Sequence, residues 1–248
     1  EQMEAATRIP FWPDVVRPTQ APRFTLYASN LRALRHAVWS TESVNLLVGA
    51  NGAGKTTLLQ VLKLLRLAYE RGLPEAVSIA LGGSSNLRSW GAVDNAPIEI
   101  GLDVGEASWR IQLTPREGSV DHVACERLIE QGKEIFSRDT LGGFRYGGEF
   151  IETTSEHIGL RVLVDRGAID RPIREVANFL QRVAVYQEPD LWNLRWQGSN
   201  ASEDRDLQTR GGNALAVLRR WLQDRTQQHR YDFVIGGMAS AFPNIFKT

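Results

Sequence analysis

The chain has 248 residues, which is enough to bury a substantial core in one large domain or two small ones. With 42% hydrophobic residues, 23% charged residues and a formal net charge of zero, it has an ordinary globular composition, and a chain-wide basic surface for nucleic acid is excluded. Its single cysteine excludes an internal disulfide, and its apolar runs are too short to cross a bilayer, so we expect a cytoplasmic protein without membrane contact.

The chain begins with residues 1–23, which contain four prolines and predict an irregular arm outside the folded core. Phe24–Leu31 and Leu34–Ser40 are then predicted to form two strands, joined by a tight turn near Asn30. Ser43–Val48 follows as a short apolar run, which predicts a buried strand that leads directly into a glycine-rich segment.

That glycine-rich segment, Gly49–Thr56, fits the phosphate-binding pattern G-x-x-x-x-G-K-[ST]. Glycines let backbone amides approach phosphate oxygens closely, and a helix that starts directly afterwards adds the positive end of its dipole. We expect Lys55 to reach the β- and γ-phosphates and the Thr56 hydroxyl to ligate Mg²⁺. The sequence therefore predicts a nucleoside triphosphate site formed by Gly49, Asn51, Gly52, Ala53, Gly54, Lys55, Thr56 and Thr57.

The helix expected after the loop is supported by dense apolar spacing over Leu58–Ala68. Gly72–Asn95 is predicted to be rich in loops. Ile98–Val104 and Trp109–Thr114 alternate apolar and polar residues and predict strands of an antiparallel meander, to which His122–Ile129 adds a further candidate.

From residue 139 onward, the sequence predicts loop and strand first and mostly helices later. In chain order, the predictions are a long loop at 139–155, a strand at 160–165, a helix at 173–182, a short strand at 183–186, a loop at 192–205, and helices at 214–222 and 231–242. We expect one lobe over 24–248, with a nucleotide-binding core at 24–70, a β-rich region at 97–165 and a mostly helical region at 171–248.

The loop G-A-N-G-A-G-K-T-T-L-L resembles the ABC-type branch of P-loop ATPases, and within it the RecF/SMC-related proteins often labelled AAA family ATPases. Phe24–Leu34 is similar to the first strand of that family with its N-F-[RK]-S element, of which Asn30 and Arg32 are retained. Gly211–Leu218 is similar to the family's G-S-N-L-A-x-V-L segment. The resemblance implies an α/β fold, the N-terminal lobe of an ABC-ATPase-like P-loop NTPase, with an antiparallel β-rich subdomain and a C-terminal helical part.

Members of that family hydrolyse ATP with an L-S-x-G signature motif and a strand that ends in Asp-Glu, and we find neither in this sequence. The strand expected to end at Asp165 could mimic the second element, but Arg161 interrupts it and Arg166 stands where the Glu belongs, so we interpret it as a plain strand end. The resemblance places Gln187 where a Mg²⁺-contacting glutamine lies, with a solvent-facing glutamine as the alternative. The chain is thus expected to be an incomplete ATPase lobe.

Three hypotheses follow. The first is an ATP-binding lobe that uses ATP and Mg²⁺, turns over poorly alone, and hydrolyses only with a missing second half and a partner lobe. The resemblance implies a homodimer formed through the nucleotide, a DNA-related process such as repair or phage defence, and DNA or a nuclease as a partner. The second is an interaction module that binds nucleotide without hydrolysing it, and the third is a small-molecule kinase. The choice between ATP and GTP stays open.

Overall fold

In the computed structural model the chain forms two compact units, Glu1–Val183 and Ala184–Thr248. The residues that it describes are 23–42, 44–83, 87–89, 91–92, 96–114, 122–140, 142–187, 189–196, 198–199 and 206–242. Within these ranges, no helix combines the length and the apolar character that a membrane-crossing segment needs.

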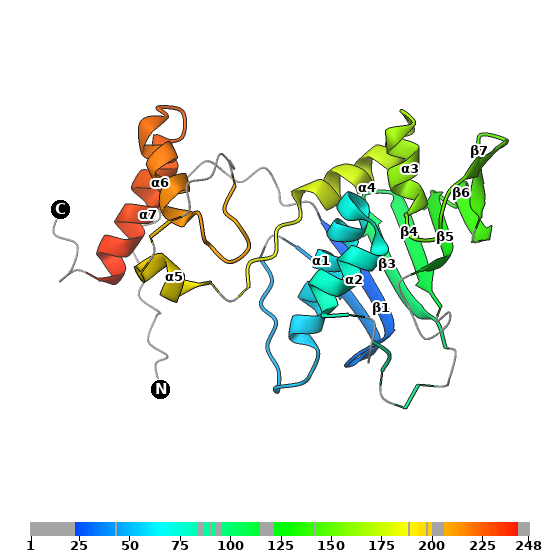
Figure 1. The fold of residues 1–248 in the computed structure, drawn as a ribbon, viewed down its shortest axis with the longest axis horizontal. Helices are drawn as coiled ribbons and strands as arrows, with labels where there is room; N and C mark the ends of the chain where they lie inside the picture. Colours follow the sequence, from blue (N-terminus) through cyan, green and yellow to red (C-terminus); the bar gives the residue numbers. More distant parts are fainter. Residues whose placement is uncertain are drawn as a thin grey trace, which may run out of the picture. The chain divides into compact units, whose positions relative to one another are not determined.

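The first unit is built on an eight-stranded sheet in which every neighbouring pair of strands is antiparallel (Figure 1). The strands are β1 (Phe24–Leu31), β2 (Leu34–Ser40), β3 (Ile98–Val104), β4 (Ala107–Leu113), β5 (Val123–Glu130), β6 (Lys133–Thr140), β7 (Gly143–Tyr146) and β8 (Glu149–Glu152). Their order is β2-β1-β3-β4-β5-β6-β7-β8. The predicted strand pair at the start of the chain and the predicted antiparallel meander are both confirmed.

Alternation along the strands gives the sheet one apolar face and one polar face. In β3, Ile100 and Leu102 are buried, whereas Asp103 on the opposite face accepts a hydrogen bond from Arg110 of β4 at 2.6 Å. The Arg110 guanidinium also lies 4.1 Å above the ring of Tyr27, whose hydroxyl donates to Asp103 at 2.8 Å. The polar face is therefore satisfied by cross-strand pairs, and the apolar face is left to pack against helices.

Four helices cover the apolar face (Figure 1): α1 (Lys55–Arg71), α2 (Leu73–Leu81), α3 (Gly159–Asp165) and α4 (Arg171–Arg182). The first and last of these confirm the helices predicted after the glycine loop and at 173–182. On α4 the predicted apolar stripe is fully inside, because Ile173, Val176, Phe179 and Leu180 are all buried. Burial of each such side chain stabilises the fold by about 1.5–3 kcal/mol.

Three predicted segments of this unit have a different structure. Gly72–Asn95, predicted as loop, contains α2, which ends at Gly82 in a left-handed conformation with φ of 74°. The segment 139–155, also predicted as loop, contains β7 and β8, because Gly147 and Gly148 have φ of 59° and 86° and close a tight hairpin. The segment 160–165, predicted as a strand, lies in α3.

A buried carboxylate explains why a helix starts at Gly159. Glu126 on β5 is fully buried, and its carboxylate accepts hydrogen bonds from the amides of Gly159 at 2.5 Å and Leu160 at 3.1 Å. The indole N–H of Trp109 donates to the same carboxylate at 2.9 Å. These bonds satisfy amides that a helix start leaves without partners, so α3 is specified by a residue far away in sequence.

The cross-strand neighbour of Glu126 is Arg138 on β6, which is also fully buried. The Arg138 guanidinium donates to the carbonyl oxygens of His157 at 2.7 Å and Thr154 at 2.8 Å. Burial raises the pKa of Glu126, while its hydrogen bonds and the charge of Arg138 lower it only in part. The pair ties the loop before α3 to the sheet.

The second unit contains α5 (Leu191–Trp196), α6 (Ala214–Gln223) and α7 (Gln228–Ala241). The last two confirm the helices predicted at 214–222 and 231–242. The short strand predicted at 183–186 is wrong, because these residues have no regular structure, and part of the loop predicted at 192–205 is instead helical in α5.

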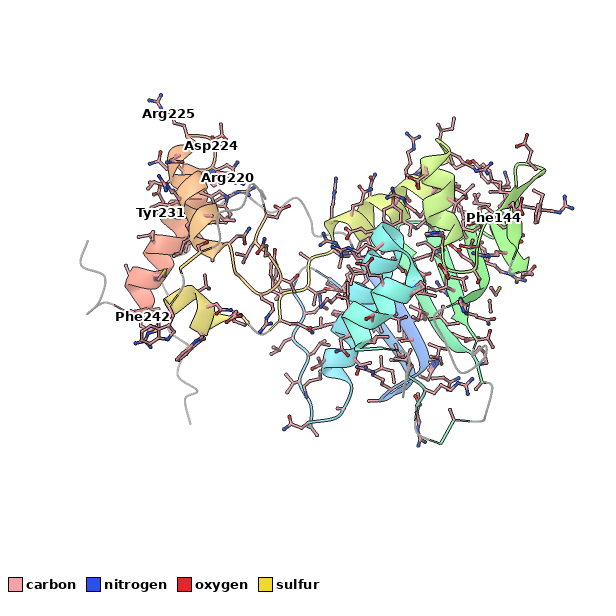
Figure 2. The ribbon with its side chains drawn as sticks, viewed as in Figure 1. Phe144, Arg220, Asp224, Arg225, Tyr231 and Phe242 are labelled. Carbon is pink, nitrogen blue, oxygen red and sulfur yellow. The ribbon has the colours of Figure 1, made fainter. Side chains whose placement is uncertain are left out.

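A polar turn joins α6 and α7. The Asp224 carboxylate accepts hydrogen bonds from the amide of Thr226 at 2.9 Å and from its hydroxyl at 2.7 Å, and these bonds lower the pKa of Asp224. Figure 2 shows Asp224 and Arg225 at this turn and Phe242 at the far end of α7. This turn makes α6 and α7 an antiparallel helical hairpin (Figure 1).

Candidate functional site

The segment before α1 forms a turn that depends on glycine. Gly52 has φ of 82° and Gly54 has φ of 93°, both in the left-handed region. A residue with a Cβ atom is disfavoured there by about 1–2 kcal/mol, so glycine suits both positions. The amide of Ala53 donates to the carbonyl of Ala50 at 3.2 Å, which closes the turn. Successive amides in such a turn can line a concavity for an anion.

The N-terminus of α1 directly follows this turn. Its N-cap is Gly54, which makes no side-chain cap, and the first turn carries no acidic residue. The amide of Leu58 donates to the carbonyl of Gly54 at 2.9 Å, while none of the described residues accepts a hydrogen bond from the amides of Lys55, Thr56 and Thr57. These N–H groups and the positive end of the helix dipole are therefore available to an anion.

Lys55 is the charged residue of the site. Its ammonium group donates to the carbonyl oxygens of Gly49 at 2.7 Å and Ala50 at 2.8 Å, both within the same loop. No carboxylate among the described residues forms an ion pair with it. The positive charge therefore stays at the loop without an acidic partner to neutralise it. An ammonium group has three donors, of which these two carbonyls use two.

The β1–β2 turn lies against the glycine loop at Gly54. A Cβ atom placed on Gly54 would lie only 2.6 Å from Cδ2 of Leu34 and 3.6 Å from Cβ of Ala33. Leu34 is 5% exposed, so its side chain is buried beside Gly54. The two threonines that follow differ in their surroundings, because Thr56 is exposed and Thr57 is buried.

The strand predicted to lead into the loop is wrong for the residues that the structure describes. Residues 44–50 have no strand pairing, and Ser43 lies outside the described residues. Val44, Leu46 and Val48 are 89%, 86% and 82% exposed. A strand needs hydrogen-bonded neighbours, and the sheet of this unit ends at β2 without reaching this segment. The apolar pattern is real, but nothing among the described residues covers it.

The other candidate residues lie apart from the loop or in the other unit. Asp165 is at the end of α3, not at the end of a strand, and its carboxylate pairs with Arg161 at 2.9 Å. Gln187 belongs to the second unit, where its amide donates to the carbonyl of Thr209 at 3.3 Å. Within the first unit, the predicted residues from Gly49 to Thr57 form the glycine loop and the start of α1.

Sequence reasoning missed the residues that hold the loop in place. Leu34 and Ala33 lie next to Gly54, and Arg32 in the same turn donates to Gln60 on α1, whereas the sequence pattern indicates for Arg32 only a match to a family element or a solvent-facing arginine. The available signal was Asn30, whose φ of 58° fits the preference of asparagine for left-handed turns. That signal locates the turn but does not say what it touches.

A protein-family model described as "AAA domain, putative AbiEii toxin, Type IV TA system" matches residues 44–179. The chain belongs to this AAA domain family. The AAA match covers more than half of the 248 residues and includes the glycine loop, α1 to α3, most of α4, and the strands from β3 to β8. It starts at Val44, so β1, β2 and the turn beneath the loop precede it. A comparison with curated proteins finds no match.

Proposed function

We propose that this chain is the ATP-binding lobe of a RecF/SMC-like ATPase, with ATP and Mg²⁺ as its ligands. The observation that carries the proposal is the glycine turn that presents free amides at the start of α1 beside the unpaired charge of Lys55. Membership of an AAA domain family whose match includes this loop supports it. The residues fit a triphosphate chain, because amides, a helix N-terminus and a lysine are the groups that bind phosphate.

Each residue of the loop has a distinct task in this proposal. The free amides of Lys55, Thr56 and Thr57 hold phosphate oxygens, while the ammonium group of Lys55 leaves the carbonyls of Gly49 and Ala50 and turns to the terminal phosphates. The exposed Thr56 hydroxyl holds Mg²⁺. Bound MgATP would supply the phosphoanhydride bond and the charge neutralisation that phosphoryl transfer needs.

We infer that hydrolysis requires parts beyond this lobe. The apolar side chains of Val44, Leu46 and Val48 are exposed directly before the loop. Such an exposed apolar segment indicates a surface that another part of the protein covers, here a strand of a sheet. Asp165, the carboxylate that could stand in for the family's Asp-Glu strand end, is paired with Arg161 on α3 and is not poised to orient an attacking water. A second half and a partner lobe would supply both, in a homodimer held together through the nucleotide.

The process served by this ATPase is proposed to be DNA-related, in repair or phage defence, with DNA or a nuclease as partner. The family description names a toxin of a type IV TA system, which favours phage defence. DNA binding would make affinity fall steeply with salt, because phosphate contacts release counterions. A partner capture that is insensitive to salt would point instead to a protein partner.

Isothermal calorimetry with MgATP tests the proposal. We expect heat of binding with the wild-type chain, none with Lys55→Ala, and wild-type behaviour with Lys63→Ala, a half-buried lysine further along the same helix α1. Turnover by the chain alone should be small. Absence of binding by the wild-type chain, or equal binding by Lys55→Ala, would contradict the nucleotide site, and fast hydrolysis by the monomer would contradict the need for a second half.

A second candidate is an interaction module that binds nucleotide but does not hydrolyse it. The pairing of Asp165 with Arg161 favours it, because this carboxylate is then not free to orient an attacking water. The two candidates separate when the chain is joined to a polypeptide that carries a signature motif and an Asp-Glu strand. Turnover that then appears supports the ATPase, and binding that stays without turnover supports the interaction module.

A further inference from the structure

Arg32 connects the β1–β2 turn to three other segments of the first unit. Its guanidinium donates through Nη1 to the side-chain oxygen of Gln60 on α1 at 3.1 Å, and through Nη2 to the carbonyl of Leu81 at the end of α2. Its own amide donates to the carbonyl of Leu87 at 2.7 Å. The turn is thereby fastened to both helices that follow the glycine loop.

The backbone of Arg32 is in an unusual conformation for its residue type. Its φ is 51°, in the left-handed region that glycine and asparagine adopt more readily than arginine. Glycine would fit this backbone without strain. The presence of arginine at such a position indicates that its side chain has a task there that a smaller residue would not perform.

The neighbours of Arg32 touch the glycine loop itself. The side chains of Leu34 and Ala33 lie nearest to the place where a Cβ atom on Gly54 would stand, at 2.6 Å and 3.6 Å. Gln60, the acceptor of the Arg32 guanidinium, lies on α1, whose first amides face the phosphate in the proposed function. Arg32 thus links the β1–β2 turn, which contacts Gly54, to α1, which follows the glycine loop.

We propose that Arg32 is a positioning residue of the nucleotide site, an inference that rests on the proposed function. It does not touch the ligand. Its planar guanidinium spans acceptors on α1 and α2 and so fixes how far the β1–β2 turn lies from the first turn of α1. This distance sets the position of Leu34 against Gly54. It therefore also sets the direction in which the free amides at the start of α1 point.

Three substitutions separate the side chain from the backbone. Arg32→Gly keeps the left-handed turn and removes both guanidinium contacts. Arg32→Lys keeps the charge but offers a single compact donor group, which reaches one of the two acceptors. Arg66→Ala is the matched control, because Arg66 is also an arginine that donates to a backbone carbonyl, that of Val183 at 2.5 Å, but lies farther along α1 from the loop.

Two measurements read out the effect, hydrogen exchange of the amides of residues 52–58 without nucleotide and the dissociation constant for MgATP. We expect Arg32→Gly to accelerate exchange in this segment and to weaken MgATP binding by about tenfold, with Arg32→Lys in between. Arg66→Ala should leave both unchanged. Thermal unfolding of each variant checks that the fold is retained.

The outcomes distinguish the two proposals. If Arg32→Gly exchanges and binds like wild type while Lys55→Ala loses binding, Arg32 has no positioning role and the nucleotide site stands. If the wild-type chain does not bind MgATP, the proposed function fails, and hydrogen exchange alone decides whether Arg32 holds the loop. Equal effects of Arg32→Gly and Arg66→Ala on the exchange of the loop would show general loosening and would also overturn the inference.

Discussion

Glu126 and Arg138 face each other on adjacent strands with no exposed surface on either residue. The carboxylate accepts the first amides of α3, and the guanidinium donates to carbonyls of the loop that precedes α3. A charge buried this deeply is tolerated only with a compensating charge and hydrogen bonds around it. The pair therefore anchors α3 to the sheet, and each member depends on the other.

Removal of the charge of one member of the Glu126–Arg138 pair should strongly lower the stability of the fold. Glu126→Gln keeps the size of the side chain but leaves Arg138 without a compensating charge, and we expect the free energy of unfolding to fall by about 3–5 kcal/mol. Urea unfolding measures this. Glu99→Gln, on the exposed face of β3, is the control and should change stability by no more than about 0.5 kcal/mol. Similar small effects of both substitutions would show that the buried charge is not needed.

Gly54→Ala tests the conformation of the glycine loop. The new Cβ atom would stand 2.6 Å from Leu34 on a backbone with φ of 93°, so we expect a loss of about 1–2 kcal/mol in stability and a loss of MgATP binding. Gly49→Ala is a matched control for stability, because its Cβ atom would lie 3.7 Å from Ala53, an ordinary contact. Chemical unfolding of both variants should separate them, and equal stability would argue against the strained loop.

The exposed segment before the loop makes a simple prediction about two leucines. Leu46 is 86% exposed and Leu64 on α1 is fully buried. We expect Leu64→Ala to lower the free energy of unfolding by about 2–5 kcal/mol. Leu46→Ala should change it by no more than about 0.5 kcal/mol in this chain. A large effect of Leu46→Ala would mean that the segment is covered in solution.

Tyr146 should make stability depend on pH in the alkaline range. Burial, and then the hydrogen bond from its hydroxyl to Asp170, raise the pKa of Tyr146 from 10.0 to about 12. Because the folded pKa is above the unfolded one, this stabilisation is complete below pH 10 and is lost as the pH rises through about 12. Tyr146→Phe should flatten that decline, and Tyr186→Phe, at an exposed position, should not.

The absorbance of phenolate gives an independent check of this prediction. The difference between the titrations of the wild-type chain and of Tyr146→Phe isolates one phenol. That difference should rise at a pH well above 10, near 12. A midpoint at the ordinary tyrosine value would show that the contact with Asp170 does not form in solution.

Segments whose structure follows from their own residues were predicted well. Phe24–Leu31 and Leu34–Ser40 alternate, and both are strands; the spacing of Ile173, Val176, Phe179 and Leu180 predicted α4, and all are buried. The glycine loop was also visible, because its pattern requires residues that tolerate left-handed angles, as Gly52 and Gly54 do.

Segments decided by distant partners were not predictable in the same way. An apolar run such as 160–165 fits a buried strand or a helix equally well. Glu126, more than thirty positions away, decides for the helix by accepting the amides of Gly159 and Leu160. The run at 44–48 has the pattern of a buried strand, but a local pattern carries no information about whether a neighbouring strand is present.

The pairing of β1 with β3 has a consequence for the order in which the sheet forms. β2, the glycine loop, α1 and α2 all lie in the stretch of chain between these two adjacent strands, so the pairing of β1 with β3 closes a long loop. Closing so long a loop is slow compared with forming the later hairpins. The pairing of β1 with β3 should therefore form late during refolding, after the meander from β3 to β8.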